Sequence, residues 1–429
     1  MDFCLNFKKR AVVFLLTLAP LVISAPGFTA GSLGGKSIAS ADFFIRWHRS
    51  VPLAARTLRY RRLGVRVIWR SALVPDLERV VSFTEILSQV GMQSLRQTRG
   101  VLYAEPNFKV RRNLPAYPVF ASPRTDLQET PNDPLFPRQW ALVGPKGVNP
   151  QGAWTITTGS RDIKVAIIDT GVDPTHPELS DRLALGYDFI DNTAAVFDHH
   201  GHGSHVSGII GARTNNGVGI AGINAQVTLI PIRAVPTNGD ETDANVIAAF
   251  EFAVKQGARV ANCSFGKSES SKAVGDTIAA TGLHGLTVVV AAGNDGSDIN
   301  ENPTFPASFQ TPNMIVVAAD NSSGNLAGFS NYGLGKVDLA APGASIISSV
   351  KGGGYATWDG TSMATPQVVG VAALTLAANP ALTVEQLKKI LLLTTAKETS
   401  MSGKITTGGR VDASAAVRMA HGLAMRMRH

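Results

Sequence analysis

The sequence predicts an α/β fold in which a parallel sheet is covered by helices on both faces and is preceded by a small α+β unit. Short apolar runs recur at residues 164–168, 227–232, 260–264, 287–292 and 314–318. Helical stretches separate several of these runs, including residues 243–256 and 273–284. Strands that are apolar throughout are buried on both faces, which is typical of parallel sheets. A composition with 44% hydrophobic and 17% charged residues is typical of a chain with a large buried core.

The first element is a predicted signal peptide over residues 1–27. Three basic residues at positions 8–10 precede an apolar run at 11–25, which is short for a membrane span. We therefore expect a secreted protein, extracellular or periplasmic, without stable membrane insertion. An uncleaved N-terminal anchor remains the alternative.

A separate small unit is predicted over residues 41–112. Alternation predicts a strand at 65–69, apolar spacing predicts a helix over 78–96, and an apolar run predicts a closing strand at 100–106. Four prolines among polar residues make 113–132 an extended linker open to proteolysis. The large domain then spans 133–420.

The charge is divided unevenly along the chain. The formal net charge is +8, yet residues 1–130 carry 19 basic and 8 acidic groups, and residues 131–429 carry 21 basic and 24 acidic groups. Because the excess lies in the predicted leader and small unit, it argues against nucleic-acid binding. The basic N-terminal part would dock on an acidic face of the large domain, or would only aid solubility.

Three segments carry the residue types needed for nucleophilic acyl transfer. Asp169 follows the buried strand at 164–168, His202 lies between glycines at a helix start, and Ser362 lies at the start of a second helix. An acid can orient an imidazole, and the imidazole can take the proton of an attacking hydroxyl. Each residue taken alone has a structural explanation as a turn or helix cap, so the prediction depends on all three together.

Asn294 ends another strand of the same predicted sheet. Its amide is placed to donate a hydrogen bond to an oxyanion that forms near Ser362. Histidines also lie at 199, 200 and 205, but the segment has neither a cysteine partner nor the His-Glu-x-x-His pattern of a zinc site.

The segments around Asp169, His202, Asn294 and Ser362 resemble those of the subtilisin-like serine proteases, the subtilase family, in the same chain order. The resemblance covers about residues 133–417. It implies a subtilisin-like catalytic domain and a serine endopeptidase that acts on polypeptides as a monomer. The rival hypothesis is a non-catalytic peptide-binding protein on the same scaffold.

The resemblance also implies substrate-binding and regulatory parts. It implies that Ser264, Phe265 and Gly266 form a strand that pairs with the substrate backbone. It also implies that Ala291, Ala292 and Gly293 form one wall of the specificity pocket. Residues 41–112 are similar to the family's pro-domain, which would inhibit the enzyme until its removal by self-cleavage.

A structural calcium site is the last implication of the resemblance. The positions that match family ligands are Asp133, Glu178, Thr214, Asn216, Val218 and Ile220. Oxygen donors of this kind suit calcium. Two departures are a glutamate at 178, where an aspartate is more usual, and one extra loop residue at Arg213. An ordinary capped turn is the alternative.

Overall fold

The structure is a computed structural model that describes residues 42–82, 87–115, 118–119 and 131–426. All of these belong to one compact unit of the chain, which spans 37–429. The predicted signal peptide and most of the predicted linker lie outside the described residues.

A nine-stranded sheet forms the centre of the large domain, in the order β16-β17-β13-β12-β11-β10-β6-β8-β7. All neighbouring strands are parallel except β16 and β17. The strands are β6 (Gly159–Asp169), β7 (Tyr187–Asp188), β8 (Gln226–Arg233), β10 (Val260–Cys263), β11 (Thr287–Ala291), β12 (Met314–Asp320), β13 (Leu339–Pro342), β16 (Ala396–Lys397) and β17 (Gly409–Arg410). The predicted parallel α/β architecture is thereby confirmed.

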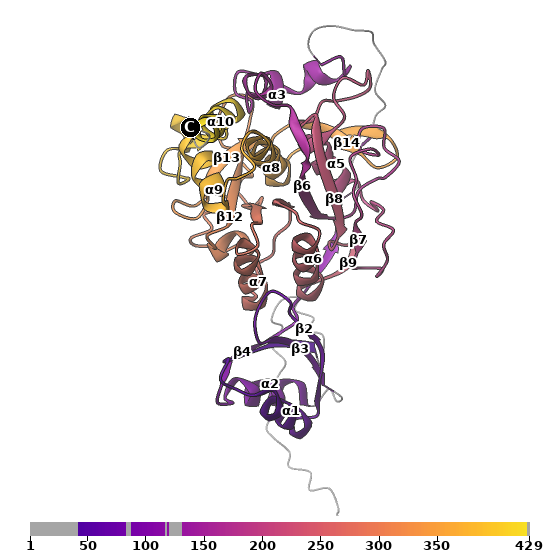
Figure 1. Cartoon of the computed structure of the whole chain (residues 1–429), viewed down its shortest axis with the longest axis vertical. Coiled ribbons are helices and arrows are strands. Elements are labelled where there is room, and N and C mark those ends of the chain that lie inside the picture. Colours follow the sequence, from indigo (N-terminus) through magenta and orange to yellow (C-terminus); the bar gives the residue numbers. More distant parts are fainter. Residues whose placement is uncertain (1–41, 83–86, 116–117, 120–130, 427–429) are drawn as a thin grey trace, which may run out of the picture. The chain divides into compact units, whose positions relative to one another are not determined.

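Helices cover both faces of this sheet (Figure 1). On one face lie α5 (His202–Gly211) and α8 (Thr361–Ala378), and on the other lie α6 (Asp243–Lys255) and α7 (Lys272–Gly282). Alternate residues of β6 enter different cores: Val165 and Ile167 pack with α5 and α8, whereas Ala166 and Ile168 pack with α6 and α7. This two-sided burial explains why β6 is apolar in consecutive positions.

Further elements belong to the large domain. They are α3 (Trp140–Val143), α4 (Pro150–Trp154), α9 (Val384–Leu393) and α10 (Ala413–Arg426), with the antiparallel pair β14 (Ile346–Val350) and β15 (Gly354–Trp358). α8 is long and apolar enough to cross a membrane, but 83% of it is buried inside the protein. It is therefore a buried helix of the core, and α9 and α10 pack beside it.

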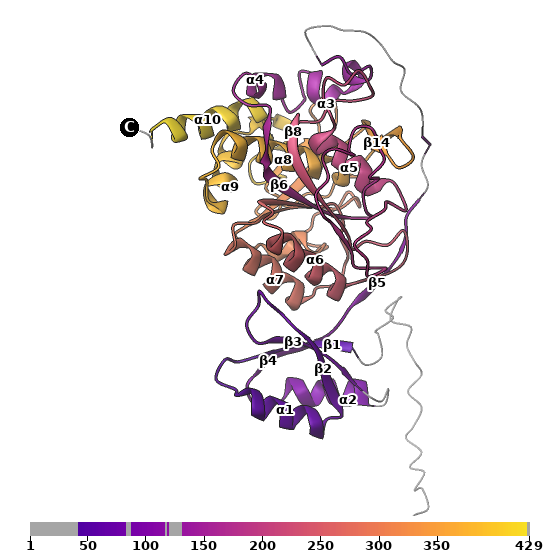
Figure 2. The same cartoon turned by 45° about the vertical axis from the view of Figure 1, so that its right-hand side comes forward.

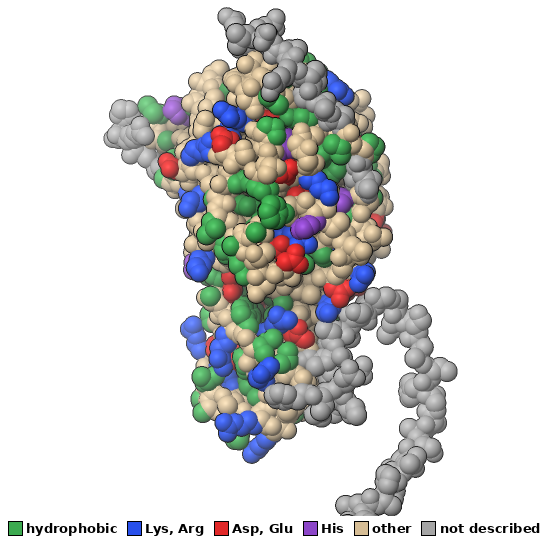
Figure 3. Space-filling model, turned by 90° about the vertical axis from the view of Figure 1, so that its right-hand side faces the viewer, with side chains coloured by type: hydrophobic (Ala, Val, Ile, Leu, Met, Phe, Trp, Pro, Cys, Tyr) green, Lys and Arg blue, Asp and Glu red, His purple; other side chains and the backbone are tan. Residues whose placement is uncertain are grey.

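The small N-terminal unit, called the small unit below, has an antiparallel sheet in the order β2-β3-β1-β4 with two helices on one face (Figure 2). Its elements are β1 (Asp42–Trp47), α1 (Leu53–Arg62), β2 (Val65–Arg70), β3 (Leu77–Ser82), α2 (Leu87–Arg96) and β4 (Val101–Pro106). Lys and Arg side chains gather over its surface in Figure 3, which agrees with the basic excess seen in the sequence.

The predicted helix over 78–96 is wrong in its first part. Residues 77–82 form β3, a central strand, and the helix α2 is described over Leu87–Arg96. Charged residues are uncommon in a central strand, so Glu78 and Arg79 made this segment resemble the polar side of a helix. In the structure both side chains are paired inside the unit. Glu78 accepts hydrogen bonds from Tyr60 and Arg70, and Arg79 bonds to Asp42.

Candidate active site

Asp169 and His202 are held together at the carboxyl edge of the central sheet. Asp169 is the last residue of β6, and His202 is the first residue of α5. Nδ1 of His202 lies 2.7 Å from Oδ1 of Asp169. The carboxylate is 1% exposed, so water screens this contact little.

Burial of the imidazole lowers the pKa of His202, but the charge of Asp169 and its hydrogen bond outweigh burial and hold this pKa above its usual value. The neighbouring His205 behaves differently: burial lowers its pKa to about 3, so it stays neutral. The indole of Trp358 stacks on His205 at 4.5 Å and on His202 at 6.0 Å between ring centroids.

The start of α5 is positioned by Asp198, a residue that the sequence analysis missed. Its carboxylate accepts hydrogen bonds from the backbone N–H groups of His200, Gly201 and Ser204 and from the hydroxyl of Thr170. A carboxylate at a helix N-terminus satisfies free N–H groups and favours the helix dipole. Since Thr170 follows Asp169, Asp198 ties the loops of both site residues together.

A glycine allows the close approach of these two loops. A Cβ at position 203 would lie 1.8 Å from the carbonyl oxygen of Gly171. Any larger residue at 203 would push His202 away from Asp169.

Ser362 is the second residue of α8 and lines the same cavity as Asp169 and His202, which has a volume of about 970 Å³. Its hydroxyl donates a hydrogen bond to the carbonyl oxygen of Ser264 at 3.1 Å, and the hydroxyl of Ser264 donates back to the carbonyl oxygen of Ser362 at 3.0 Å. The start of α8 is thus fastened to the end of β10.

Asn294 lies directly beside the start of α8. Its side-chain oxygen accepts hydrogen bonds from the backbone N–H and the hydroxyl of Thr361, at 2.8 and 2.9 Å. With the oxygen fixed, the amide NH₂ has no acceptor among the described residues and can donate to a ligand, and Asn294 also lines the cavity.

Four of the six expected substrate-binding residues reach the cavity, and these are Ser264, Phe265, Gly266 and Gly293. Ala291 ends β11 and Ala292 follows it directly, and both are buried rather than part of the cavity lining.

Comparison with known proteins identifies the family of this chain. A model of the subtilase family matches residues 160–414. A thermophilic serine proteinase from Bacillus sp. (strain AK1) is 39% identical over 306 residues, which cover 70% of this chain and 70% of the relative. The chain belongs to the subtilase family.

Two further comparisons extend this result. The subtilase is 32% identical to an extracellular protease of Xanthomonas campestris pv. campestris over 436 residues, covering 90% of this chain and 71% of the relative. A solved protease from Pseudoalteromonas arctica PAMC 21717 is similar with a TM-score of 0.61 and 31% identity, over 68% of this chain and all of that one. The subtilase is accordingly a serine endopeptidase that acts on polypeptides.

The expected calcium ligands lie together around one loop of the subtilase. Asp133 accepts hydrogen bonds from the backbone of Asn215 and Asn216, and Glu178 accepts from Asn216 Nδ2, Ile220 N and the Tyr355 hydroxyl. Thr214 and Val218 lie in the same loop, and the N–H of Val218 donates to Asn216 Oδ1.

The two carboxylates beside this loop, Asp133 and Glu178, accept hydrogen bonds from no cationic side chain in the described part of the chain. They are 1% and 0% exposed, and the hydrogen bonds described above come from neutral groups. Burial raises the pKa of Asp133 and raises that of Glu178 to about 8. Two buried carboxylates with nearby amide and carbonyl oxygens form a donor set that fits calcium.

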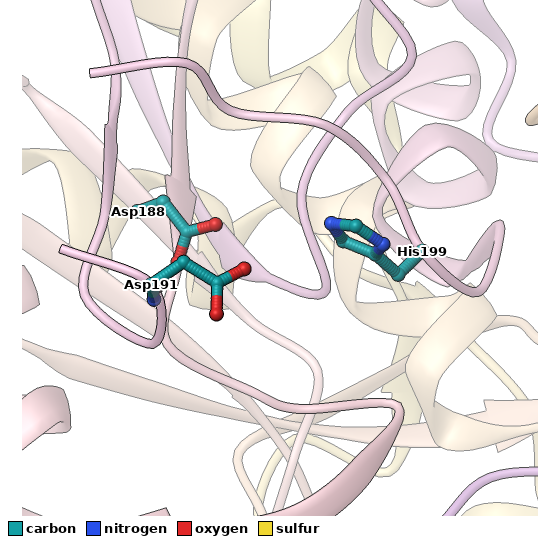
Figure 4. A group of neighbouring side chains, drawn as sticks. All are labelled: Asp188, Asp191 and His199. Carbon is teal, nitrogen blue, oxygen red and sulfur yellow. Dashed lines mark hydrogen bonds between the residues drawn. The ribbon is translucent and has the colours of Figure 1, made fainter. Parts of the chain in front are cut away.

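A second acidic group needs no cation. Figure 4 shows Asp188, Asp191 and His199, whose possible ligand atoms lie within 4.8 Å of one another. However, Nη1 of Arg233 lies 2.7 Å from Asp188 and 2.6 Å from Asp191. The guanidinium already supplies the positive charge there.

A segment of the subtilase's own chain lies in the cleft. The strand β5 (Lys109–Asn113) pairs antiparallel with β9 (Asn238–Thr242), and Arg112, Leu114 and Pro115 line the cavity with Ser362. The sequence analysis assigned these residues to the end of the small unit and to the linker and missed their place in the cleft. The segment Lys109–Asn113 has one apolar residue among four polar ones and so no strand alternation, and its partner β9 lies far away in the sequence.

Proposed function

We propose that Ser362 is the nucleophile of this endopeptidase, that His202 is its general base and acid, and that Asp169 orients His202. The observation that carries the proposal is the 2.7 Å contact of Asp169 and His202 on the wall of the cavity that Ser362 also lines. The hydroxyl of Ser362 donates to the carbonyl oxygen of Ser264 in this structure, and on substrate binding it would turn to donate to the imidazole of His202 instead.

The reaction would proceed through an acyl-enzyme. His202 takes the proton of Ser362 as the hydroxyl attacks the peptide carbonyl, and it then gives that proton to the leaving amine. The amide of Asn294 and the backbone N–H of Ser362 donate to the oxyanion, and the N-terminus of α8 favours its negative charge. Water then repeats the sequence and releases the acid product.

The small unit with β5 would act as an inhibitory pro-domain. Its strand β5 pairs with β9, bonds to Gly266 through Arg112 and leads into residues that line the cavity with Ser362, so it would occupy the place of a substrate. Glu105 also accepts hydrogen bonds from Ser271 and from two backbone N–H groups at the start of α7, and Asn107 accepts one from the start of α6. These contacts cap two helices of the catalytic domain and would stabilise it during folding.

Export and calcium binding complete the proposal. The basic–apolar N-terminus and the relative named an extracellular protease support secretion. Asp133, Glu178 and Asn216 would hold a calcium ion, whose role would be to stabilise the loop at 212–220.

Expression of the full chain and of its Ser362→Ala variant tests the assignment. The unaltered protein should react with a fluorophosphonate probe and lose its N-terminal part. The variant should remain unlabelled and full-length in a host that lacks other proteases able to cut it. Normal maturation of the variant there, or an unlabelled unaltered protein, would contradict the assignment and favour a peptide-binding protein.

A further inference from the structure

The pairing of β5 with β9 places basic side chains against acidic ones along the substrate cleft. Residues 109–113 are Lys-Val-Arg-Arg-Asn, and β9 contains Asp240 and Glu241. The register pairs Val110 with Glu241 and Arg112 with Gly239. Because β5 would be removed on maturation, these acidic groups would then face the substrate.

The contact of Arg112 with Glu241 is the most buried of these pairs. Nε of Arg112 lies 2.8 Å from Glu241, and Nη2 of the same guanidinium donates to the carbonyl oxygen of Gly266 at 2.9 Å. The two side chains are 17% and 4% exposed. One planar group thus bridges both walls of the cleft, β9 on one side and the segment after β10 on the other.

The other basic residues of β5 make looser contacts. Lys109 lies 3.4 Å and Arg111 3.7 Å from Asp240, and the Arg111 side chain is 72% exposed. Exposed pairs of this kind contribute little. Asp240 is therefore a suitable control position when Glu241 is substituted, because it is an acidic residue of the same strand whose ion pairs are more exposed.

Among the described residues that line the cavity, the acids outnumber the cations. The acids are Asp169, Asp295, Glu301 and Asp359, and the cations are Arg112 and Lys267. Lys267 is already paired with Asp243. Departure of β5 removes Arg112 and leaves the Glu241 carboxylate without its guanidinium.

We propose that Glu241 determines substrate specificity and selects polypeptides with arginine at the position that Arg112 occupies, on the N-terminal side of the bond to be cut. This inference rests on the proposed function, because it treats β5 as a substrate bound in the cleft. A substrate guanidinium would restore both hydrogen bonds that Arg112 makes. Lysine has a single ammonium group and cannot bridge Glu241 and the Gly266 carbonyl with the same planar geometry, so arginine should be preferred to lysine.

Matched peptides test the proposal with the mature enzyme. The parent is an internally quenched peptide with the sequence of residues 108–115, Phe-Lys-Val-Arg-Arg-Asn-Leu-Pro. Three companions carry Gln in place of Arg112, Lys in place of Arg112, or Gln in place of Arg111. Mass spectrometry identifies the bond cut in each, and kcat/KM is compared only for cleavage at the same bond.

We expect the parent to exceed the Arg112→Gln peptide by about 10- to 100-fold in kcat/KM, the range for a hydrogen-bonded charged group. The Arg112→Lys peptide should fall between them, and the Arg111→Gln peptide should lose less than about threefold. Equal rates for the parent and the Arg112→Gln peptide would overturn the proposal.

Enzyme variants assign the preference to one carboxylate. In Glu241→Gln the ratio between the parent and the Arg112→Gln peptide should fall toward one, whereas in Asp240→Asn it should stay within about threefold of the unaltered value. An unchanged ratio in Glu241→Gln would overturn the proposal. Fluorophosphonate labelling of each variant verifies that its site has folded.

The same measurements separate this inference from the proposed function. An enzyme that is labelled and cuts all peptides equally refutes the specificity alone. An unaltered protein that neither reacts with the probe nor cuts any peptide refutes the proposed function.

Discussion

The side-chain oxygen of Asn294 accepts two hydrogen bonds from Thr361, the residue immediately before Ser362. These bonds fix the segment after β11 to the start of α8. They also fix the orientation of the Asn294 amide and therefore of its NH₂ group. A donor held in place before reaction stabilises an oxyanion without reorganisation.

Asn294→Ala should lower kcat by about 100- to 1000-fold with little change in KM, the scale known for such a donor in this family. The lost interaction forms only as the oxyanion develops, so ground-state binding is little affected. Steady-state kinetics on one peptide checks this. Asn302→Ala, which removes another amide from the cavity wall, should cost far less, and an equal loss in both variants would contradict the role of Asn294.

The pH profile of kcat/KM should have an acid limb set by His202. The base must be neutral to accept the proton of Ser362, and the pKa of His202 is raised because the charge and hydrogen bond of Asp169 outweigh burial. Activity should therefore fall as the pH drops through a value above that of an ordinary histidine. Asp169→Asn should move this limb to lower pH and also reduce kcat. An acid limb at the same pH in Asp169→Asn would show that Asp169 does not control the pKa of His202.

Calcium should raise the unfolding temperature of the Ser362→Ala protein, a background that prevents self-digestion. Binding at 100 times its dissociation constant would add about 2.7 kcal/mol to the free energy of unfolding. Glu178→Gln should remove most of this effect, because it removes the charge of one of the two buried carboxylates that contact the loop. Calorimetry with EGTA and with added magnesium provides the control, and equal responses in both proteins would argue against this site.

Arg410 is expected to support stability through Asp320. Both side chains are buried, Arg410 bonds to Asp320 and Glu398, and burial raises the pKa of Asp320 to about 7. In the Ser362→Ala background, Arg410→Met should lower the free energy of unfolding by about 3–5 kcal/mol, because it leaves a buried carboxylate without its partner.

The pH dependence of this variant has a defined sign. Burial raises the pKa of Asp320 to about 7 in the unaltered protein although Arg410 lowers it, so without Arg410 this pKa lies higher still. The folded variant therefore binds the Asp320 proton more tightly than the unfolded chain does, so this group favours folding at low pH and loses that contribution as the pH rises above about 4. Denaturant titration of Arg410→Met should thus show partial recovery at acid pH. The double variant with Asp320→Asn should be more stable than Arg410→Met at pH 8, and a further loss would contradict the explanation.

The residues of the candidate site were predictable because each lies at the end of an element with a strong local pattern. Asp169 ends an apolar strand, and His202 and Ser362 begin helices rich in small residues. Parallel strands bring such ends to one edge of a sheet. Asp198 lacked a comparable signal, since it lies in a loop and its role depends on contacts with Thr170 and Ser204.

The sequence by itself determined the α/β class, the positions of Asp169, His202, Asn294 and Ser362 in their elements, and the division of charge between the two parts of the chain. Only the tertiary structure decided that residues 77–82 form a strand and that Arg112 meets Glu241, 129 positions away. Hydrophobic periodicity and turn residues involve positions close together in the sequence, so they can be recognised from short segments. Strand partners depend on register between distant segments, which is settled only when the whole sheet and its two cores pack together.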